Sequence, residues 1–343
     1  MKPRIKDIAE MLDLSPATVS NALNHQRGVN HETRERVLSV AKSLGYRVNE
    51  PSEALQCVRF VIYRKHGMVV MDTPFFSELI AGIDSECRVN GYELIVSHIN
   101  KNTDNDYLER IKEITDGAKA PVLLLATEMD YDDIQPFLGI DVPLLVLDSY
   151  FIGLNLNTVS IENYEAGYTA ASYFLKNQHR HIGFISSEPF FNNVSFRLGG
   201  LSNTLENANL TMSPHDIIAV EPTIEGSYRG MLAHLNKRNM RSYPLPTAFF
   251  AFNDIVASGS MRAFKEFGIR IPQDISIIGM DNMPMCQITD PPLTTISVFK
   301  SEMGAVAVRR LLRMANHNTR AHEIIFLGVR LIERDSVCVS IPR

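Results

Sequence analysis

The first 23 residues contain two short amphipathic segments, 5–12 and 16–23, separated by a three-residue turn. Ser15 is suited to cap the second segment, because its hydroxyl can accept an unpaired backbone N–H at a helix start. Pro16 stands at the first helical position, where its fixed φ is favourable and its missing N–H costs nothing. Asp13 lies in the turn, and aspartate tolerates the left-handed conformation. The pattern predicts a helix-turn-helix, whose second helix enters the major groove of DNA.

A third helix is predicted after Asn30, a suitable N-cap residue. Apolar residues then recur at helical spacing and form one stripe: Val37, Val40, Ala41 and Leu44. We expect this stripe to close a small core against the first two helices, on Ile8, Leu12, Leu14, Val19 and Leu23. A three-helix bundle without a ligand is the alternative, but the turn, cap and spacing together favour DNA binding.

Four short motifs occur in this segment: IKDIA at 5–9, ATVS at 17–20, TRERV at 33–37 and LGY at 44–46. Together they closely resemble the headpiece of the LacI/GalR family of bacterial transcriptional regulators. The resemblance implies a DNA-binding headpiece at residues 1–48 that contacts double-stranded operator DNA. The residues implied are Lys6, Ser15, Pro16, Ala17, Thr18, Ser20, Asn21, Asn24, His25, Arg27 and Leu55.

At the positions where the family reads bases, this chain carries Pro16, Ala17 and Asn21. Pro16 and Ala17 offer only apolar contacts, for example to thymine methyl groups, whereas Asn21 can pair with adenine. The operator sequence is therefore only weakly constrained.

Residues 49–57 are expected to form a hinge linker, because the helical periodicity breaks there. Family members usually carry a short hinge helix here, which orders on DNA and inserts a leucine into the minor groove. Leu55 falls at that position. Glu50, Pro51 and Glu53 depart from the family pattern, and carboxylates near phosphates lower affinity. We expect this hinge to bind more weakly, or only when the effector state permits.

Length and charge suggest several domains and a dimer. The chain has 343 residues, so the headpiece leaves enough sequence for two further compact lobes. Residues 1–50 carry eight basic and six acidic side chains, whereas the whole chain has a net charge of −5. This small local excess suits phosphate contact, and we expect a homodimer to supply two headpieces. With no apolar run of membrane length and no secretory signal, we expect no membrane partner and a cytoplasmic location.

The sequence lacks the patterns of common enzymes and metal sites. It contains no HExxH, GxSxG or Walker motif and no GxGxxG after a predicted strand. We therefore expect no enzymatic activity, no metal and no cofactor. The cysteines show no C-x-x-C and no metal-ligand spacing, and are interpreted as small apolar residues: Cys57, Cys87, Cys286 and Cys338. The segment 179–181, His-Arg-His, is expected to be a solvated turn.

Beyond residue 57, apolar strand-like runs alternate with amphipathic helices, which predicts parallel sheets covered on both faces. Two such series predict an α/β core of two doubly wound lobes. Expected strands are 58–63, 93–96, 121–125, 144–147, 182–185, 248–252 and 275–279. Expected helices are 75–90, 104–115, 164–176, one from 195, and 255–267.

Polar residues follow several of these strands, and ligands of such sheets bind beyond the carboxyl ends of the strands. Asp148, Asn253, Asp254 and Asp281 all stand at such ends and could converge on one cleft. Taken singly, Asp254 is better explained as a helix N-cap, and Asn253 could be a turn residue.

Further motifs extend the resemblance: TPFFSE at 73–78, RLGG at 197–200, NDIVASG at 253–259, IGMD at 278–281 and PPLTTI at 291–296. They resemble the periplasmic sugar-binding proteins, whose fold forms the effector domain of LacI/GalR regulators. In the family the chain crosses three times between the lobes. This implies an N-terminal lobe of residues 58–161 and 292–323, and a C-terminal lobe of 162–291 and 324–343.

The chemistry of the expected cleft suits a sugar. Phe75 and Phe76 can stack on a sugar ring, while Arg197 offers a fork of donors and Asp148 and Asp281 offer acceptors for vicinal hydroxyls. The predicted effector contacts are Phe75, Phe76, Thr127, Asp148, Arg197, Tyr228, Asn253 and Asp281. Phe190 and Phe191 could face the cleft or pack within a loop.

These features predict a dimeric repressor that binds a near-palindromic operator and is controlled by a small molecule, and the cleft residues favour a sugar. Other effectors remain open: a nucleobase, a phosphorylated metabolite or a partner protein. A solute-binding protein without a DNA role is the alternative from another class.

Overall fold

The computed structural model describes residues 4–23, 29–44, 46, 56–70, 74–116, 120–238, 240, 243–316 and 321–340. The chain divides into two compact units, Met1–Gln56 and Cys57–Arg343. Four of the expected DNA contacts lie outside the described residues: Asn24, His25, Arg27 and Leu55. Most of the expected hinge linker lies outside them as well.

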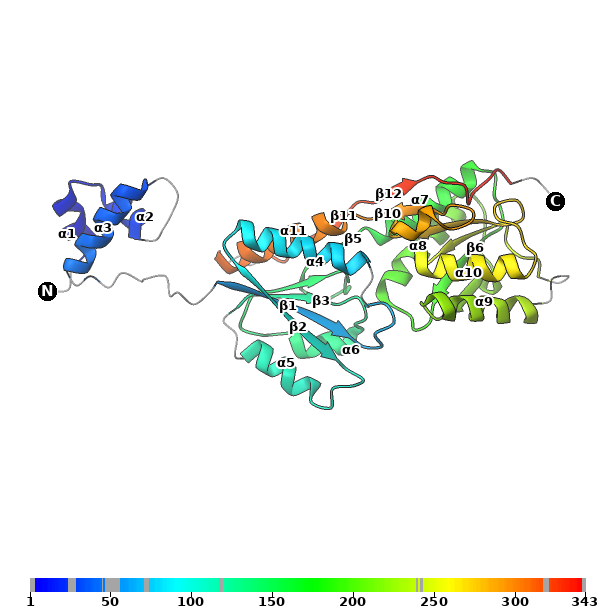
Figure 1. The fold of residues 1–343 in the computed structure, drawn as a ribbon, viewed down its shortest axis with the longest axis horizontal. Coiled ribbons are helices and arrows are strands. Elements are labelled where there is room, and N and C mark those ends of the chain that lie inside the picture. Colours follow the sequence, from blue (N-terminus) through cyan, green and yellow to red (C-terminus); the bar gives the residue numbers. More distant parts are fainter. Residues whose placement is uncertain are drawn as a thin grey trace. The chain divides into compact units, whose positions relative to one another are not determined.

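The first unit contains the three expected helices, α1 (Ile5–Leu12), α2 (Pro16–Leu23) and α3 (His31–Ser43) (Figure 1). Ser15 Oγ accepts the backbone N–H of Thr18 at 3.0 Å, and Asn30 Oδ1 accepts that of Thr33 at 2.8 Å. Asp13 adopts the left-handed conformation, with φ of 53°. Both predicted caps and the predicted turn are therefore confirmed.

The core of this unit is small and comes from all three helices. Its fully buried members are Ile8, Ala9, Val19, Ala22, Leu23, Val37 and Ala41. Leu12, Leu14, Val40 and Leu44 pack against it and are partly buried. The predicted stripe thus meets the first two helices as expected.

The second unit contains two six-stranded sheets of the same connectivity. The sheet of the N-terminal lobe has the order β11-β5-β4-β3-β1-β2, and all its pairs are parallel. Its strands are β1 (Cys57–Arg64), β2 (Glu93–Asn100), β3 (Val122–Leu125), β4 (Leu144–Leu147), β5 (Asn157–Ile161) and β11 (Ile324–Leu327). Helices α4 (Pro74–Val89) and α11 (Lys300–Asn316) pack together on one face. Helices α5 (Tyr107–Asp116) and α6 (Tyr131–Ile134) lie on the other (Figure 1).

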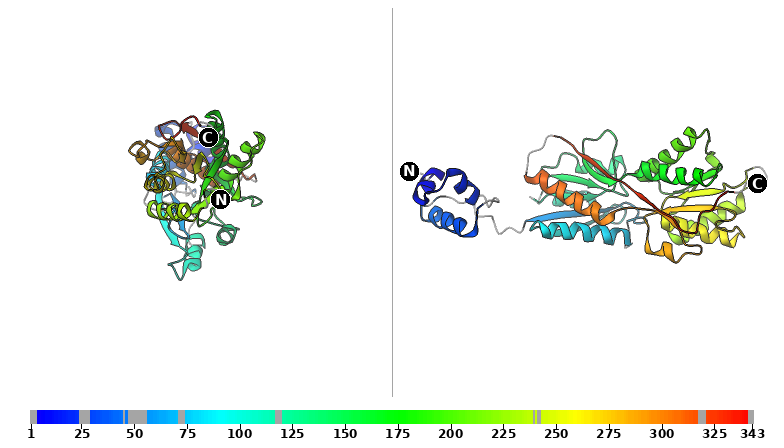
Figure 2. Two further views of the ribbon diagram at one scale, coloured as in Figure 1. Left: turned by 90° about the vertical axis from the view of Figure 1, so that its right-hand side faces the viewer. Right: turned by 90° about the horizontal axis from the view of Figure 1, so that it is seen from above.

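The sheet of the C-terminal lobe has the order β12-β10-β9-β8-β6-β7, and only the β10–β12 pair is antiparallel. Its strands are β6 (Ile182–Ser187), β7 (Ile217–Val220), β8 (Ala248–Ala251), β9 (Ser276–Met280), β10 (Thr294–Ser297) and β12 (Arg330–Ile332). Two helix pairs cover it (Figure 2). One pair is α7 (Asn163–Lys176) with α8 (Asn192–Asn207), and the other is α9 (Ile224–Lys237) with α10 (Asp254–Glu266).

Two of the three expected lobe crossings are misplaced by a few residues. β10 belongs to the C-terminal lobe, so the second crossing follows Ser297 rather than residue 291. β11 pairs with β5 of the N-terminal lobe, so the third crossing follows Leu327 rather than residue 323. β10, β11 and β12 are only three or four residues long, and they carry no periodicity that could assign them to a sheet.

Two glycines set the close crossing of α7 and α8. A Cβ on Gly167 would lie 2.0 Å from the carbonyl oxygen of Arg197, and one on Gly200 would lie 2.0 Å from that of Tyr164. Any larger residue would push the helices apart. This contact therefore fixes the position of α8, the helix that carries Arg197.

Outside the candidate site, one sequence interpretation needs correction. His179 is not solvated but 2% exposed, and its ring nitrogens lie 2.9 Å from Thr247 Oγ1 and 3.0 Å from the Cys338 carbonyl. The ring ties the C-terminal segment to the lobe core. The four cysteines are free. No helix in the described ranges is long and apolar enough to cross a membrane.

Candidate functional site

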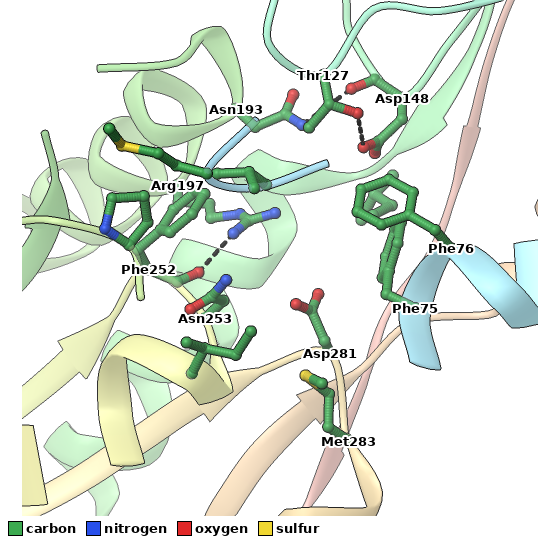
Figure 3. Close-up of a pocket in the computed structure, with 15 residues that line it drawn as sticks. Phe75, Phe76, Thr127, Asp148, Asn193, Arg197, Phe252, Asn253, Asp281 and Met283 are labelled. Atoms are coloured by element: carbon green, nitrogen blue, oxygen red, sulfur yellow. Dashed lines mark hydrogen bonds between the residues drawn. The ribbon is translucent and has the colours of Figure 1, made fainter. Parts of the chain in front are cut away.

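A cavity between the two lobes gathers most of the predicted effector residues (Figure 3). Of the eight, all but Tyr228 line it: Phe75, Phe76, Thr127, Asp148, Arg197, Asn253 and Asp281. The cavity volume is about 40 Å³, which holds only a few water molecules. Ligand pockets usually measure roughly 300–1,000 Å³. The cleft is thus nearly closed.

Two carboxylates enter the cavity from the carboxyl ends of strands, one from each lobe. Asp148 directly follows β4 and is 2% exposed, and Asp281 directly follows β9 and is 8% exposed. Their backbones have φ of 60° and 106°, in the region that favours glycine. The angle at Asp281 is the more strained, and such strain is retained mainly at functional positions. Asp281 N–H also donates to Ile296 O of β10 at 2.8 Å, close to the second lobe crossing.

Arg197 on α8 faces these carboxylates and is 4% exposed. Its Nε donates to Asn163 Oδ1 at 2.8 Å, and its Nη1 donates to the Phe252 carbonyl. The guanidinium also lies over the Phe252 ring, 4.8 Å from the centroid. Two protein acceptors and an aromatic face therefore hold the planar fork in place, which leaves further donors for a ligand.

Two residues that line the cavity each carry a buried acceptor without a protein donor among the described residues. Asp148 Oδ2 accepts the Thr127 hydroxyl at 2.7 Å, but Asp148 Oδ1 has no partner. Asn193 Nδ2 donates to the Asp148 carbonyl at 2.9 Å across the lobes, but Asn193 Oδ1 has no partner. Leaving a buried acceptor unpaired costs about 1–3 kcal/mol, so a hydrogen-bond donor at either oxygen would stabilise this arrangement.

Burial shifts the protonation of the charged groups. It raises the pKa of Asp148 to about 7, although the Thr127 hydroxyl and the Arg197 charge oppose the rise. It raises the pKa of Asp281 to about 6, against the opposing charges of Arg197 and Lys300. It lowers the pKa of Arg197 below the usual range, while three neighbouring carboxylates counteract this effect. Around neutral pH the two pocket carboxylates are therefore close to titration.

The aromatic wall comes from the first turn of α4. Phe75 and Phe76 contact each other edge to face, with centroids 4.9 Å apart, and each is 7% exposed. Figure 3 shows both rings on the side of the cavity opposite Arg197. Polar groups of one lobe thus face an apolar wall of the other, which suits a ligand with one polar and one apolar side.

The sequence interpretation of Asn253 and Asp254 is partly wrong. Asn253 is the N-cap of α10, because its Oδ1 accepts the N–H of Val256 at 2.9 Å, and it also lines the cavity. Asp254 is instead a fully buried residue of the first turn. It accepts the Met283 N–H at 2.8 Å and the Thr295 hydroxyl at 2.5 Å. It therefore braces the loop that carries Asp281.

The placement of Tyr228 is also wrong. Its hydroxyl donates to Glu266 Oε2 at 2.7 Å, and its ring lies under Arg262 at 3.9 Å. Both partners are on α10, because the α9 face that bears Tyr228 packs on that helix. Neither of the two residues left open, Phe190 and Phe191, lines the cavity, and only Phe191 is packed. Phe190 is 61% exposed, and Phe191 is 3% exposed and stacks on Phe252.

Several lining residues were not predicted. They are Met68, Val69, Ile161, Asn193, Pro222, Phe252, Ile255 and Met283. Asn193 could have been found, because it lies four residues before Arg197 on the same helix face. Met68 and Val69 lie in an irregular loop and gave no sequence signal.

The second candidate site is the exposed start of α2. Ser15, Pro16 and Ala17 are exposed, whereas Val19 on the opposite side is fully buried. Lys6 on α1 is exposed as well. The Ser15 and Thr18 hydroxyls share a hydrogen bond of 2.8 Å, which orders this helix start. This end of α2 is thus free to meet a groove, as expected for a recognition helix.

Comparison with known proteins identifies the class. Residues 4–49 match the family model described as bacterial regulatory proteins, lacI family, and residues 171–337 match the periplasmic binding protein-like domain. The chain is 31% identical to the HTH-type transcriptional repressor PurR of Histophilus somni over 339 residues, covering 97% of this chain and 98% of that protein. It is 30% identical to the ribose operon repressor of Haemophilus influenzae, with the same coverage.

A solved structure supports the same family assignment. A LacI family transcriptional regulator from Enterococcus faecium with bound ribose is 26% identical with a TM-score of 0.67, and the match covers 82% of this chain and 100% of that chain. The chain belongs to the lacI family of bacterial regulatory proteins. It is a DNA-binding transcriptional repressor with a small-molecule effector, and it is not an enzyme.

Proposed function

We propose that this repressor binds a near-palindromic operator as a homodimer and that a sugar, held in the lobe cavity, controls its DNA affinity. The observation that carries the sugar assignment is the pair of orphaned acceptors, Asp148 Oδ1 and Asn193 Oδ1. A sugar supplies hydroxyl donors for both. Asp281 and Arg197 complete a set of acceptors and donors for vicinal hydroxyls, and Phe75 and Phe76 face the apolar side of the ring.

The charges disfavour a phosphorylated effector. Asp148, Asp254 and Asp281 lie in or beside the cavity, while Arg197 already gives two donors to protein acceptors. A phosphate would add negative charge beside three buried carboxyl groups, and each like-charge contact in a desolvated site is costly. The ribose operon repressor and the ribose-bound regulator among the relatives support a neutral sugar.

A homodimer is supported by the exposed edge of the N-terminal sheet. β2 is an edge strand, and its Ile95 and Val96 are 39% and 41% exposed. An open strand with apolar side chains is a ready site for pairing with another chain. Members of the family bind operator DNA typically as dimers. Size-exclusion chromatography with light scattering tests this assignment directly.

The effector is proposed to act by changing the arrangement of the lobes. The cavity is narrow, so we expect the lobes to separate for a sugar to enter and then to close on it. A ligand shifts such an equilibrium only by its difference in affinity for the two arrangements. Operator affinity then follows by linkage.

A thermal-shift screen with sugars, nucleobases and sugar phosphates tests the effector class, because a ligand of the native state raises its melting temperature. We expect neutral sugars to stabilise the protein and one of them to change its operator affinity in a gel-shift assay. Stabilisation by nucleobases or sugar phosphates alone would contradict the sugar assignment.

A further inference from the structure

The loop between β1 and α4 forms one wall of the cavity. Within it, residues 65–70 have no helical or strand structure, yet Met68 and Val69 line the cavity. The backbone N–H groups of residues 65–70 lie outside any helix or strand. Such groups need other acceptors when water is excluded.

A single side chain supplies these acceptors. Glu128 Oε2 accepts the N–H groups of Lys65, His66 and Gly67 at 2.8–2.9 Å. Glu128 Oε1 accepts those of Val69 and Val70 at 2.9 Å. One carboxylate therefore binds five backbone donors of one loop.

The carboxylate is ionised in spite of its burial. Glu128 is 2% exposed, which by itself would raise its pKa, but the N–H groups of Val70, His66, Gly67 and Val69 outweigh this effect and lower the pKa. A carboxylate that accepts several backbone N–H groups is held in its charged form. The contact therefore persists throughout the neutral pH range.

The start of the loop is fixed separately. Lys65 Nζ pairs with Asp133 at 2.9 Å and also with Asp130, while Lys101 Nζ pairs with Asp133 at 2.5 Å. These ion pairs act on side chains at the beginning of the loop. They do not hold the backbone of residues 66–70, which depends on Glu128.

From these contacts we infer that Glu128 is a positioning residue of the effector cavity: it fixes the 65–70 wall that bears Met68 and Val69, without lining the cavity itself. Its neighbour Thr127 donates to Asp148, so the segment after β3 arranges both the pocket carboxylate and the opposite wall. The consequence for effector binding rests on the proposed function, whereas the consequence for the loop does not.

Glu128→Gln tests this role in the full-length protein. Glutamine has nearly the same shape, but its amide group presents donors where the carboxylate accepts two or three N–H groups. We expect hydrogen exchange at residues 66–70 to become at least ten-fold faster. Asp216→Asn is the matched control, because Asp216 is also 2% exposed and paired, with Arg238 and His181, but lies in the C-terminal lobe. Asp216→Asn should leave hydrogen exchange at residues 66–70 unchanged.

A spectroscopic readout separates positioning from general loss of stability. Met68 and Met283 line the cavity from opposite lobes, and each carries a methyl group that NMR can follow. In methyl NMR, Glu128→Gln should shift or broaden the Met68 signal and leave that of Met283 unchanged. Glu128→Asp, which keeps the charge but withdraws it by one methylene, should give an intermediate result and serves if the glutamine variant does not fold.

The outcomes are distinct. If Glu128→Gln leaves both hydrogen exchange at 66–70 and the Met68 signal unchanged, the inference is overturned. It is also overturned if the Met68 and Met283 signals change equally. The neutral sugar that most stabilises the wild type is then titrated, and its affinity should fall at least ten-fold in Glu128→Gln but not in Asp216→Asn. If no sugar stabilises the wild type, the proposed function fails, while the exchange result still decides the role of Glu128.

Discussion

Three buried charges define the cavity at the scale of single residues. Asp148 and Asp281 come from the two lobes, and Arg197 lies between Asn163, Phe252 and the cavity. Burying charged groups is costly unless they are paired and hydrogen-bonded. The protein alone does not complete these bonds, because Asp148 Oδ1 has no donor among the described residues. The missing partner is best supplied by the effector.

Removing one of these groups should weaken effector binding selectively. We expect Asp281→Asn or Arg197→Lys to cost about 2 kcal/mol, roughly 30-fold in affinity, because charge-assisted bonds are the strong ones. Isothermal titration with the stabilising sugar measures this loss. Tyr228→Phe is the control, since its hydroxyl contacts Glu266 and not the cavity. Properly folded variants that respond fully to the effector would show that the pair is only structural.

The same carboxylates make stability depend on pH. Burial raises the pKa of Asp148 to about 7 and that of Asp281 to about 6, from an unfolded value of about 3.8. A raised pKa means that the folded state holds extra protons, so the stabilisation is complete below about pH 4. It is lost progressively as the pH rises from about 4 through 6–7. We expect the free energy of unfolding of the effector-free protein to fall between about pH 4 and pH 7, measured by urea titration.

Asp148→Asn should flatten that pH dependence, because asparagine does not titrate. If hydroxyl donors favour the ionised carboxylates, effector binding should release protons. Affinity would then rise up to about ten-fold per pH unit for each proton released. Calorimetry in buffers of different ionisation enthalpy detects the release. Proton uptake on binding would contradict this assignment.

At the scale of elements, the sequence predicts features that depend on neighbouring residues, but not contacts between distant segments. The caps Ser15 and Asn30 act within three residues, and the structure confirms both. The carboxylates after β4 and β9 were also found, because a strand end marks the ligand edge of a parallel sheet. β10 and β11 were assigned to the wrong lobes, since pairing with a distant strand leaves no trace in a four-residue segment.

Helix register explains the error at Tyr228. Tyr228 lies on α9, but the face of α9 that carries it packs against α10 and does not reach the cavity. The cavity wall at Met68 could not be predicted from the sequence for a different reason. Its position depends on Glu128, about 60 residues further along the chain, as Lys65–Glu128 and Val70–Glu128 separations of 63 and 58 residues show.

The α1–α2 element carries a prediction about sequence reading. Asn21→Ala should relax preference at one base position and cost about 1–3 kcal/mol at the cognate site, because asparagine pairs with adenine. Lys6→Ala should instead weaken binding to all sequences and lower the salt slope by about one unit. Gel shifts at several salt concentrations separate the two. Uniform loss for Asn21→Ala would reject its base-reading role.

The hinge, residues 49–57, carries a prediction of its own. If Leu55 inserts into the minor groove, Leu55→Ala should lower operator affinity without altering effector affinity of the free protein. Glu53→Lys should tighten DNA binding, most clearly at low salt, because it removes a charge that repels phosphate. If neither substitution changes operator affinity, the segment is a passive tether.

At the scale of the whole molecule, the lobe cavity and the helix-turn-helix lie in different compact units, Cys57–Arg343 and Met1–Gln56. Each unit has its own apolar core. The effector cavity is formed by segments of both lobes, and Asp281 is bonded to β10 just before a lobe crossing. If the cavity binds the effector as proposed, occupancy biases how the lobes are arranged, and we expect the crossings to transmit that bias along the chain.

This separation of units predicts reciprocal linkage. A fragment of residues 57–343 should fold and bind the effector with the affinity of the free full-length protein, but should not bind the operator, because the recognition helix is absent. In the full-length protein, saturating operator should change effector affinity by the same factor by which saturating effector changes operator affinity, about 5–150-fold for a typical coupling. Fluorescence anisotropy with labelled operator and calorimetry with the effector measure the two factors. Unequal factors at equilibrium would mean that a further bound species takes part. A fragment with altered effector affinity would show that the headpiece acts on the lobes even without DNA.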